Sequence, residues 1–354
     1  MRLLTNLSSG AGLALASALL FGASTPLAKL LLGEGLDPLL LAGMLYLGSG
    51  AGLGLVLLVR GRVSAPTSEA PLRPADLSWL ALVVLFGGIA APVLMMAGLA
   101  GVHASAASLL LNLETVCTLA IAWLVLHESV DRSLLLGAGA ILAGALILSW
   151  SGPVSGFGWG AALIAAACLA WALDNNLTRK ISAGDAVQIA CIKGLVAGIV
   201  NLGLALARGS ALPALGPLLA SALVGFLGYG VSLVLFVRAL RQIGTARTGA
   251  YYAVAPFFGT LLAIGLLGEP FTLQLAIAGA LMGLGIYFHL AEQHEHAHSH
   301  EAMMHEHSHV HDEHHRHVHG QSDPLGEPHA HVHRHRAMIH SHRHFPDIHH
   351  RHPH

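Results

Sequence analysis

Long apolar stretches alternate with short polar segments along the first 291 residues of the chain. Each stretch is about 20 residues long, the length at which an α-helix crosses roughly 30 Å of hydrocarbon. We count ten such stretches and expect an all-α integral membrane protein with ten transmembrane helices. Their approximate bounds are 10–32, 38–59, 78–100, 103–126, 133–151, 157–178, 186–207, 214–237, 248–267 and 272–291.

The composition agrees with this class of protein. The chain is 54% hydrophobic and 10% charged, whereas a soluble domain carries about 25% charged residues. It has no basic patch that would suggest nucleic acid as a partner. The three cysteines, Cys117, Cys168 and Cys191, lie in apolar segments and give no disulfide framework. We find no nucleophile–base pair and no phosphate-binding loop, so we do not expect an enzyme.

The distribution of Arg and Lys predicts the orientation in the membrane. If the N-terminus is cytoplasmic, the cytoplasmic loops carry nearly all the cations and the outside loops hold little beyond Arg208, as the positive-inside rule requires. With ten helices, the C-terminus is then cytoplasmic as well. The cytoplasmic cations are Arg60, Arg62, Arg73, Arg132, Arg179, Lys180, Arg238, Arg241 and Arg247.

The first apolar stretch resembles a signal peptide at its start, MRLLTNLSSGAGLALASA. The apolar run continues through LLFGASTPLAKLLL, which is too long for a cleaved signal. We therefore expect an uncleaved first helix in the inner (plasma) membrane.

Glycines are abundant in the helices and often lie four residues apart, as in Gly194 and Gly198 or Gly279 and Gly283. The stretch LGSGAGLGLVLL has glycine at every second position from Gly48. No strand precedes it, so a nucleotide-binding loop is a poor interpretation. Close helix packing in lipid is the better one.

The two halves of the helical region resemble each other. Phe21–Lys29 and Trp171–Arg179 both begin with an aromatic residue and end with a cation, and Leu111–Glu128 parallels Tyr252–Glu269. Five helices per half, an odd number, invert the second half across the membrane. Inverted repeats are typical of secondary transporters, which bind substrate between the halves near the midplane. We expect repeats at 10–151 and 157–291.

With these motifs the chain resembles the EamA family of the drug/metabolite transporter superfamily. The segments that carry the resemblance are FGASTPLAK, SAASLLLNLETVCTLAIAWLVLHE, AWALDNNLTRK and ARTGAYYAVAPFFGTLLAIGLLGE. The resemblance implies ten helices, both termini inside, and transport of small organic solutes, often outward. The family often has Glu-Pro in the fourth helix where this chain has Glu114-Thr115, so a bend there lacks its proline, while Pro256 keeps its place in the ninth helix.

Ionisable residues at membrane depth are costly and face a cavity or a partner. Glu114 lies halfway along the fourth helix and is our candidate acceptor for a proton or a substrate ammonium group, the alternative being a packed carboxyl group. Asp174 and Lys193, on helices that run in opposite directions, share a depth. We interpret them as a structural ion pair, with a gate or substrate clamp as the alternative.

Other polar residues in the helices are weaker candidates. Asn175 is placed in the same pathway, and Tyr252 either lines the cavity or anchors packing, as does Tyr251. Lys29 is expected to extend to the membrane interface. Other residues are expected to have no direct part in transport. We interpret His103 as a surface histidine, and Glu128 and Glu269 as residues that fix helix ends. Cys117 with Glu114 could supply half a metal site at most.

The C-terminal segment 292–354 differs in composition from the rest of the chain, because 24 of the 26 histidines lie between His289 and His354. It is polar and repetitive, so we expect a disordered cytoplasmic tail. Interleaved H-x-H spacing suits several loose sites for Zn, Ni, Co or Cu. The metal candidates are His296, His298, His300, His305, His307, His309, His311, His314, His315, His317, His319, His331, His333 and His335.

Three functions stay open at this point. The helical region favours a secondary transporter, and an exporter by preference, of a small organic solute such as an amino acid or metabolite, with a metal-binding regulatory tail. The tail favours an exporter of divalent Ni, Co or Zn. The third interpretation is a membrane-anchored metal buffer or sensor. The expected partners are the lipid bilayer, a small-molecule substrate and divalent metal ions. We expect the transporter to require no cofactor and to be a monomer or a homodimer.

Overall fold

The computed structural model describes residues 10–63, 76–125, 132–150, 158–178 and 185–291, together with four strands in the tail. The helices of the first half are α2 (Gly10–Gly33), α3 (Pro38–Val63), α4 (Leu77–Val83), the π-helix η2 (Val84–Ala90), α5 (Ala91–Ala100), α6 (Ala104–Leu110), α7 (Leu113–Leu124) and α8 (Arg132–Ser149). Those of the second half are α9 (Trp159–Thr178), α10 (Ala186–Ala207), α11 (Leu215–Gly225), the π-helix η3 (Phe226–Val231), α12 (Ser232–Tyr252), α13 (Ala255–Leu267) and α14 (Leu273–Ala291).

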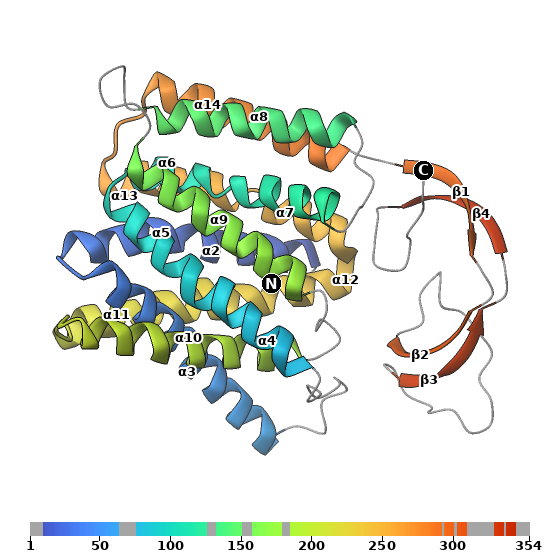
Figure 1. Cartoon of the computed structure of the whole chain (residues 1–354), viewed down its shortest axis with the longest axis horizontal. Helices are drawn as coiled ribbons and strands as arrows, with labels where there is room; N and C mark the ends of the chain where they lie inside the picture. The colour runs from blue at the N-terminus through green and yellow to red at the C-terminus, as the bar shows by residue number, and fades with distance from the viewer. Residues whose placement is uncertain are drawn as a thin grey trace, which may run out of the picture.

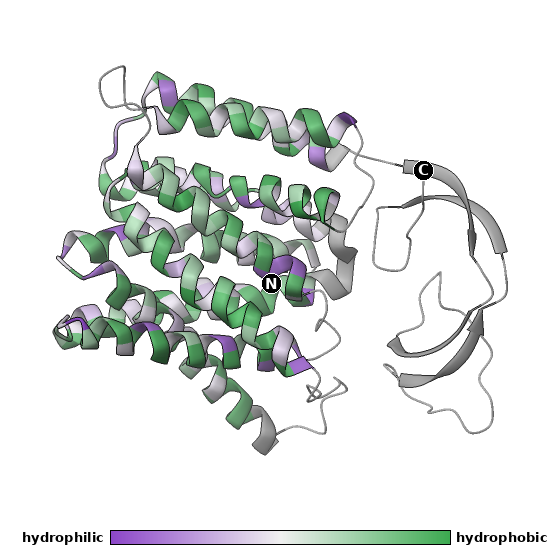
Figure 2. Ribbon diagram, viewed as in Figure 1, coloured by the Kyte–Doolittle hydropathy of each residue, from purple (hydrophilic) through white to green (hydrophobic). Residues whose placement is uncertain are grey.

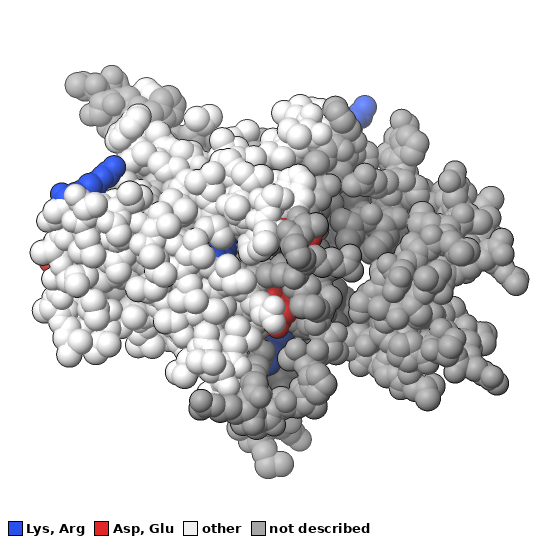
Figure 3. Space-filling model, turned by 60° about the horizontal axis from the view of Figure 1, so that its bottom comes forward, with Lys and Arg blue, Asp and Glu red and all other residues white. Residues whose placement is uncertain are grey.

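The described helices are long and apolar enough for a membrane protein. Eight helical stretches reach the length of a membrane span, and two shorter apolar helices, Ala255–Leu267 and Leu273–His289, complete the ten that the sequence predicts. Apolar residues make up most of the length of the described helices (Figure 2). Charged side chains are sparse on the part of the face that Figure 3 shows, so this surface suits hydrocarbon rather than water. The predicted all-α membrane fold is confirmed.

The chain reverses direction within α12. The rings of Phe236 and Tyr252, both in this element, have their centroids 4.8 Å apart. A straight helix would separate these two positions by about 24 Å at 1.5 Å per residue. The first part of α12 therefore completes the eighth membrane-crossing helix and its last part begins the ninth, with the reversal between Phe236 and Tyr252.

The fourth and ninth helices are both interrupted. In the fourth, a turn at Leu111 and Asn112 separates α6 from α7, and the Asn112 side chain donates to the carbonyl oxygen of Leu109 at 2.9 Å. In the ninth, a turn at Ala253 and Val254 separates α12 from α13. The fourth helix is thus broken without the family's proline, and the Leu109 carbonyl at the break accepts from both the backbone nitrogen and the side chain of Asn112.

The two halves also repeat a local deformation. Each half has a π-helix at the same place in its third helix: η2 in the first half and η3 in the second. Both contain two glycines, Gly87 and Gly88 in η2 and Gly228 and Gly230 in η3. A π-helical turn shifts backbone hydrogen bonds and is often found at functional sites. The positions of these turns and of the two helix breaks agree with the predicted internal repeat.

Glycine contacts hold α3 against α10. A Cβ atom added to Gly194 would lie 2.6 Å from the backbone nitrogen of Gly50, and one added to Gly198 would lie 2.4 Å from that of Leu47. The two backbones can approach so closely only without side chains at these positions. The predicted packing role of these glycines is confirmed. On the other side of the bundle, α8 lies alongside α14 (Figure 1).

The tail contains four strands where the sequence predicts no regular structure. β1 (His294–His300) pairs antiparallel with β4 (Met338–His344), and β2 (Met303–His309) pairs antiparallel with β3 (His329–His335). The physical reason is the period of the H-x-H pattern, because alternation every second residue matches the two-residue repeat of a strand. The register places His296 opposite His342 and His307 opposite His331.

Candidate functional site

A cavity of about 380 Å³ lies inside the helical bundle, between the two halves. Its size suits a small molecule. The wall draws side chains from α2, α3, α7, α9, α10, η3 and α12, so both repeats contribute. The lining residues are Phe21, Tyr46, Ser49, Glu114, Trp171, Asn175, Ala190, Lys193, Gly194, Gly228, Tyr229, Ser232, Leu233, Phe236 and Tyr252.

Five aromatic rings form a continuous row along this wall. Tyr46 contacts Tyr229 at 5.4 Å between ring centroids, and Tyr229 contacts Phe21 at 6.0 Å. Phe21 in turn contacts Tyr252 at 5.7 Å, and Tyr252 contacts Phe236 at 4.8 Å. These distances are those of tilted and edge-to-face aromatic pairs. The row gives the cavity a broad apolar surface with π faces.

The π-helix η2 fixes two side chains of the wall, one of them the first ring of the aromatic row. The carbonyl oxygen of Gly87 accepts a hydrogen bond from the Tyr46 hydroxyl at 2.7 Å and another from Trp171 Nε1 at 3.2 Å. The next carbonyl, that of Gly88, accepts from Asn201 Nδ2 at 3.2 Å. The deformed turn therefore offers carbonyl oxygens to side chains of three other helices, and it holds the rings of Tyr46 and Trp171 in place.

Glu114 stands at the cavity wall directly after the break in the fourth helix. Its Oε1 accepts a hydrogen bond from Asn175 Nδ2 at 2.7 Å. Asn175 is a neutral donor, so it orients this carboxylate without neutralising it. The interruption at Asn112 places Glu114 in the first turn of α7, where the positive end of the helix dipole favours a negative charge.

Asp174 and Lys193 form an ion pair beside the cavity. Both side chains are largely buried, at 6% and 17% exposure respectively, and Thr178 Oγ1 donates to the other oxygen of Asp174 at 3.2 Å. A Cβ atom at Gly87 would lie 2.0 Å from Asp174 Oδ2, so only glycine fits there. Lys193 lines the cavity, while Asp174 lies behind it.

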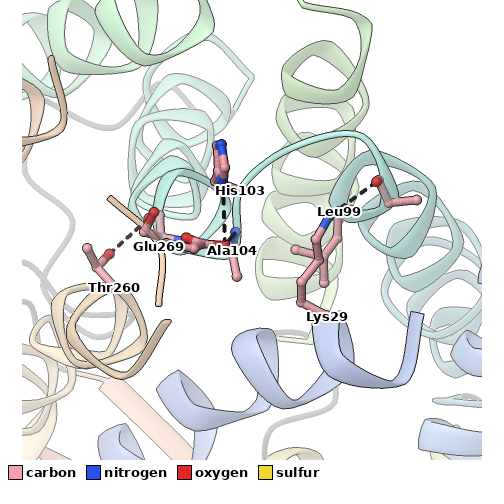
Figure 4. A network of polar contacts seen from close by, with 8 residues as sticks. Lys29, Leu99, His103, Ala104, Thr260 and Glu269 are labelled. Carbon is pink, nitrogen blue, oxygen red and sulfur yellow. Dashed lines mark hydrogen bonds and ion pairs between the residues drawn. The ribbon is translucent and has the colours of Figure 1, made fainter. Parts of the chain in front are cut away.

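A polar network lies at one end of the bundle (Figure 4). Glu269, after α13, accepts hydrogen bonds from the backbone nitrogens of Ala104 and Ser105 at 2.6 and 2.8 Å, and so caps the start of α6. His103 Nδ1 lies 3.7 Å from the same carboxylate, and Thr260 Oγ1 donates to the carbonyl oxygen of Ser105 at 3.0 Å. We call these residues the Glu269 clasp.

The same end holds Lys29. Its Nζ donates to the carbonyl oxygens of Leu99 and Ala100 at 2.7 and 3.1 Å, which are the last carbonyls of α5 (Figure 4). Lys29 is therefore a cap for the negative end of a neighbouring helix. That Lys29 extends to the membrane interface stays a prediction, and this contact is compatible with it.

The charge on Glu269 is favoured by its surroundings. Burial, at 8% side-chain exposure, raises the pKa of this carboxyl group, but the hydrogen bonds from Ser105 and Ala104 and the nearby His103 outweigh it. The net pKa lies below the ordinary value of 4.5. The predicted structural role of Glu269 is confirmed. Its counterpart in the first half, Glu128, lies outside the described residues.

The structure brings four of the predicted pathway residues to one cavity: Glu114, Asn175, Lys193 and Tyr252. The fifth, Asp174, is the partner of Lys193. Tyr251 is 38% exposed on the outside of the bundle, which separates it from its neighbour. His103 is 69% exposed, as expected of a surface histidine.

The metal candidates lie apart from this cavity, in the tail. Those in strands are His296, His298 and His300 in β1, His305, His307 and His309 in β2, and His331, His333 and His335 in β3. The remaining candidates, His311, His314, His315, His317 and His319, lie outside the described residues. Within the part of the helical region that the structure describes, no three His, Cys, Asp or Glu side chains group as metal ligands do.

Sequence reasoning missed most of the aromatic wall. Tyr46, Tyr229 and Phe236 were not candidates, although Phe21 and Trp171 were noted as matching positions of the repeat. A signal was present in the tyrosines, because the chain has only five and three of them line the cavity. A tyrosine hydroxyl in hydrocarbon needs a hydrogen-bond partner. Tyrosines in the middle of apolar stretches are therefore candidates for the lining of a cavity.

Comparison with known proteins agrees with this fold. The family model described as the EamA-like transporter family matches residues 8–150 and 158–291. An uncharacterised transporter of Methanothermobacter thermautotrophicus is 31% identical over 227 residues, which cover 62% of this chain and 66% of that protein. The uncharacterised inner membrane transporter YedA of Escherichia coli K12 is 28% identical over 242 residues, 67% of this chain and 76% of YedA.

One crystal structure, titled only as that of a protein, shares the fold with a TM-score of 0.58 and 22% sequence identity. The matched region covers 79% of this chain and 96% of the chain in that structure. The ten-helix bundle with repeated halves, and a cavity between them that is lined by aromatic rings and a few charged side chains, defines a membrane protein of the transporter class. The chain belongs to the EamA-like transporter family.

Proposed function

We propose that the protein is a secondary active transporter of a small organic solute, and an exporter by preference. The observation that carries this function is the cavity between the two repeats, which holds a carboxylate with a neutral partner, Glu114 with Asn175. Binding at the junction of two inverted halves allows access to alternate from side to side as the halves rock. The aromatic wall suits an organic solute better than a hydrated ion.

The Arg and Lys pattern supports an orientation with both termini in the cytoplasm. The Glu269 clasp then faces outside. The core next to the clasp is closely packed, with Leu99 and Ala104 at 0% exposure. The cavity, by contrast, is lined by Ala190 and Phe236, near the other ends of their helices. In this arrangement the cavity reaches toward the cytoplasm and is closed outward, as an exporter is when it loads its solute.

Glu114 is the proposed coupling site, because it can hold either a proton or a cationic group of the solute. The test is Glu114→Gln in proteoliposomes with an imposed pH gradient, measuring solute and proton flux. We expect proton-dependent flux to fall at least about tenfold, since glutamine keeps the size of the side chain but cannot ionise. The matched control is Glu34→Gln, which removes an exposed carboxylate. Unchanged proton-dependent flux in Glu114→Gln contradicts the coupling role.

The tail favours a second function, export of divalent Ni, Co or Zn with the tail gathering the cargo. The described helical region offers no cluster of metal ligands beside the cavity, so we propose a regulatory metal-binding tail on an organic-solute transporter instead. A membrane-anchored metal buffer is the weakest alternative, because the buried charges of the cavity would then be a cost without a use. If inactivating the cavity raises intracellular metal, the metal exporter is the correct function.

A further inference from the structure

The charges beside the cavity are unequal. Lys193 is matched by Asp174 in an ion pair. Glu114 faces Asn175, which is neutral. When Glu114 is ionised, the described wall of the cavity therefore lacks one positive charge. A carboxylate at membrane depth without a counter-charge is costly, and a bound cation or a proton removes that cost.

The aromatic row beside Glu114 suits an organic cation. Ammonium groups are attracted to the faces of tyrosine and phenylalanine rings within about 6 Å, and more strongly where water is excluded. Tyr252 and Phe21, in the middle of the row, have π faces next to each other at 5.7 Å. A flat apolar body fits the same surface by offset or edge-to-face stacking.

A solute carboxylate finds no comparable partner on the described wall. Such groups are bound by arginine forks, free ammonium groups or unpaired N–H groups. The described lining has no arginine, and its lysine is already bound to Asp174. Tyr46 and Trp171 donate to the carbonyl oxygen of Gly87, so these donors are engaged as well.

Serine hydroxyl groups near the aromatic row are also paired within the protein. Ser232 Oγ donates to the carbonyl oxygen of Ser17 at 3.1 Å, and Ser24 Oγ donates to that of Phe21 at 2.6 Å. A carboxylate entering the cavity would have to displace one of these partners and would also approach the charge of Glu114.

We propose that the solute is a monocationic aromatic amine whose ammonium group pairs with Glu114, and that amino acids, which add a carboxylate, are rejected. This inference rests on the proposed transport function at the same cavity and narrows its substrate class. The proposed amine differs from the amino acid that the sequence suggested as one example of a solute.

The test compares two ligands that differ by one carboxylate, 2-phenylethylamine and phenylalanine, on the purified full chain in detergent. Isothermal titration at pH 7.5 measures the dissociation constant of each. We expect the amine to bind at least about tenfold more tightly, because only the amino acid leaves a buried charge unpaired. Equal or tighter binding of phenylalanine overturns the proposal, and so does binding of neither ligand.

Two variants locate the binding. Glu114→Gln is expected to weaken amine binding by about tenfold or more, and Phe236→Leu by about three- to tenfold through loss of a π face. Glu34→Gln, on the exposed loop, is expected to bind like the unaltered protein. Phe236→Leu keeps an apolar side chain, so the test survives if Glu114→Gln fails to fold. Amine binding that neither variant changes places the ligand elsewhere and overturns the proposal.

Failure of this inference is distinguishable from failure of the transport function. If phenylalanine both binds and is carried across proteoliposomes in a proton-dependent way, the transporter stands and the amine specificity falls. If the amine binds through Glu114 but no ligand crosses the membrane, the site stands and the transport function falls.

Discussion

At the residue scale, the buried pair of Asp174 and Lys193 gives a sharp prediction. Asp174→Asn or Lys193→Met alone leaves one uncompensated buried charge, and each is expected to lower the free energy of unfolding by about 3–5 kcal/mol. The double variant removes both charges and should regain most of this loss. The measurement is unfolding of the purified protein in mixed detergent micelles, with flux assayed in parallel.

The flux of the double variant separates the two roles of this pair. Normal transport indicates a structural ion pair that two neutral side chains can replace. Stable protein without transport indicates a gate or clamp, because the charges themselves are then required. A double variant less stable than either single one contradicts the pairing.

Individual residues differed in how far the sequence could place them. Asp174 and Lys193 could be matched from the depth of each in oppositely directed helices, and the ion pair confirms it. Tyr251 and Tyr252 could not be separated, because adjacent helical positions differ by about 100° in direction and the rotation of the helix follows from its packing. The roles of Glu114 and Asn175 remain predictions.

At the element scale, the start of α6 is capped by the carboxylate of Glu269, which follows α13. Glu269→Gln is expected to lower the free energy of unfolding by about 0.5–2 kcal/mol at pH 7, as loss of a helix cap does. The pKa of Glu269 is lowered in the folded state. Its contribution is therefore present above the ordinary pKa and is lost as pH falls through the folded one.

The measurement is thermal unfolding of both proteins from pH 7 down to acid. The difference between Glu269→Gln and the unaltered chain should shrink on acidification, since a protonated Glu269 also lacks its charge. Glu34→Gln, with its side chain exposed, should show little difference at any pH. A difference that grows toward low pH would falsify the assignment of Glu269 as an ionised cap.

The contact between α3 and α10 supports a second prediction at this scale. Gly194→Ala places a methyl group against the backbone of Gly50 and is expected to cost about 1–3 kcal/mol, as overpacking does. Gly203→Ala lies on the same helix with nothing within 4 Å of the added Cβ, so it should be neutral or slightly stabilising. Equal stability of the two variants, measured by unfolding in mixed micelles, contradicts close packing at Gly194.

Helices could be predicted where the length of an apolar stretch determines them. Interruptions of helices, where local hydrogen bonds form, could not. The ten helices followed from runs of about 20 apolar residues. The break at Asn112 did not, because it contains no proline, and the bonds of Asn112 to the Leu109 carbonyl leave no pattern in the sequence. The π-helix η2 also carries no sequence signature beyond its glycines, and its Gly87 carbonyl accepts hydrogen bonds from both Tyr46 and Trp171.

At the scale of the whole molecule, the two repeats build a cavity that neither half could form alone. Phe21 comes from the first half and Tyr229 and Tyr252 from the second, and they meet in one aromatic row. The repeat was visible in the sequence as matching segments. The row was not, because it depends on the chain reversing within α12, which returns Tyr252 to the side of Phe236.

The role of the tail also concerns the whole molecule, and deletion of residues 292–354 tests whether the tail binds metal and whether transport needs it. We expect the full chain to bind several divalent ions at pH 7.5, because neutral imidazoles ligate Zn or Ni, and to lose most of this binding below about pH 6, where imidazole is protonated. The shortened chain should bind few ions yet keep its flux of organic solute, since the cavity lies in the helical region. Calorimetry at the two pH values and proteoliposome flux measure both properties on the same preparations. If removing the tail abolishes solute flux while the helical region stays folded, the tail belongs to the transport pathway. If both proteins bind metal equally, the histidines are a solvated polyelectrolyte and the metal site lies elsewhere.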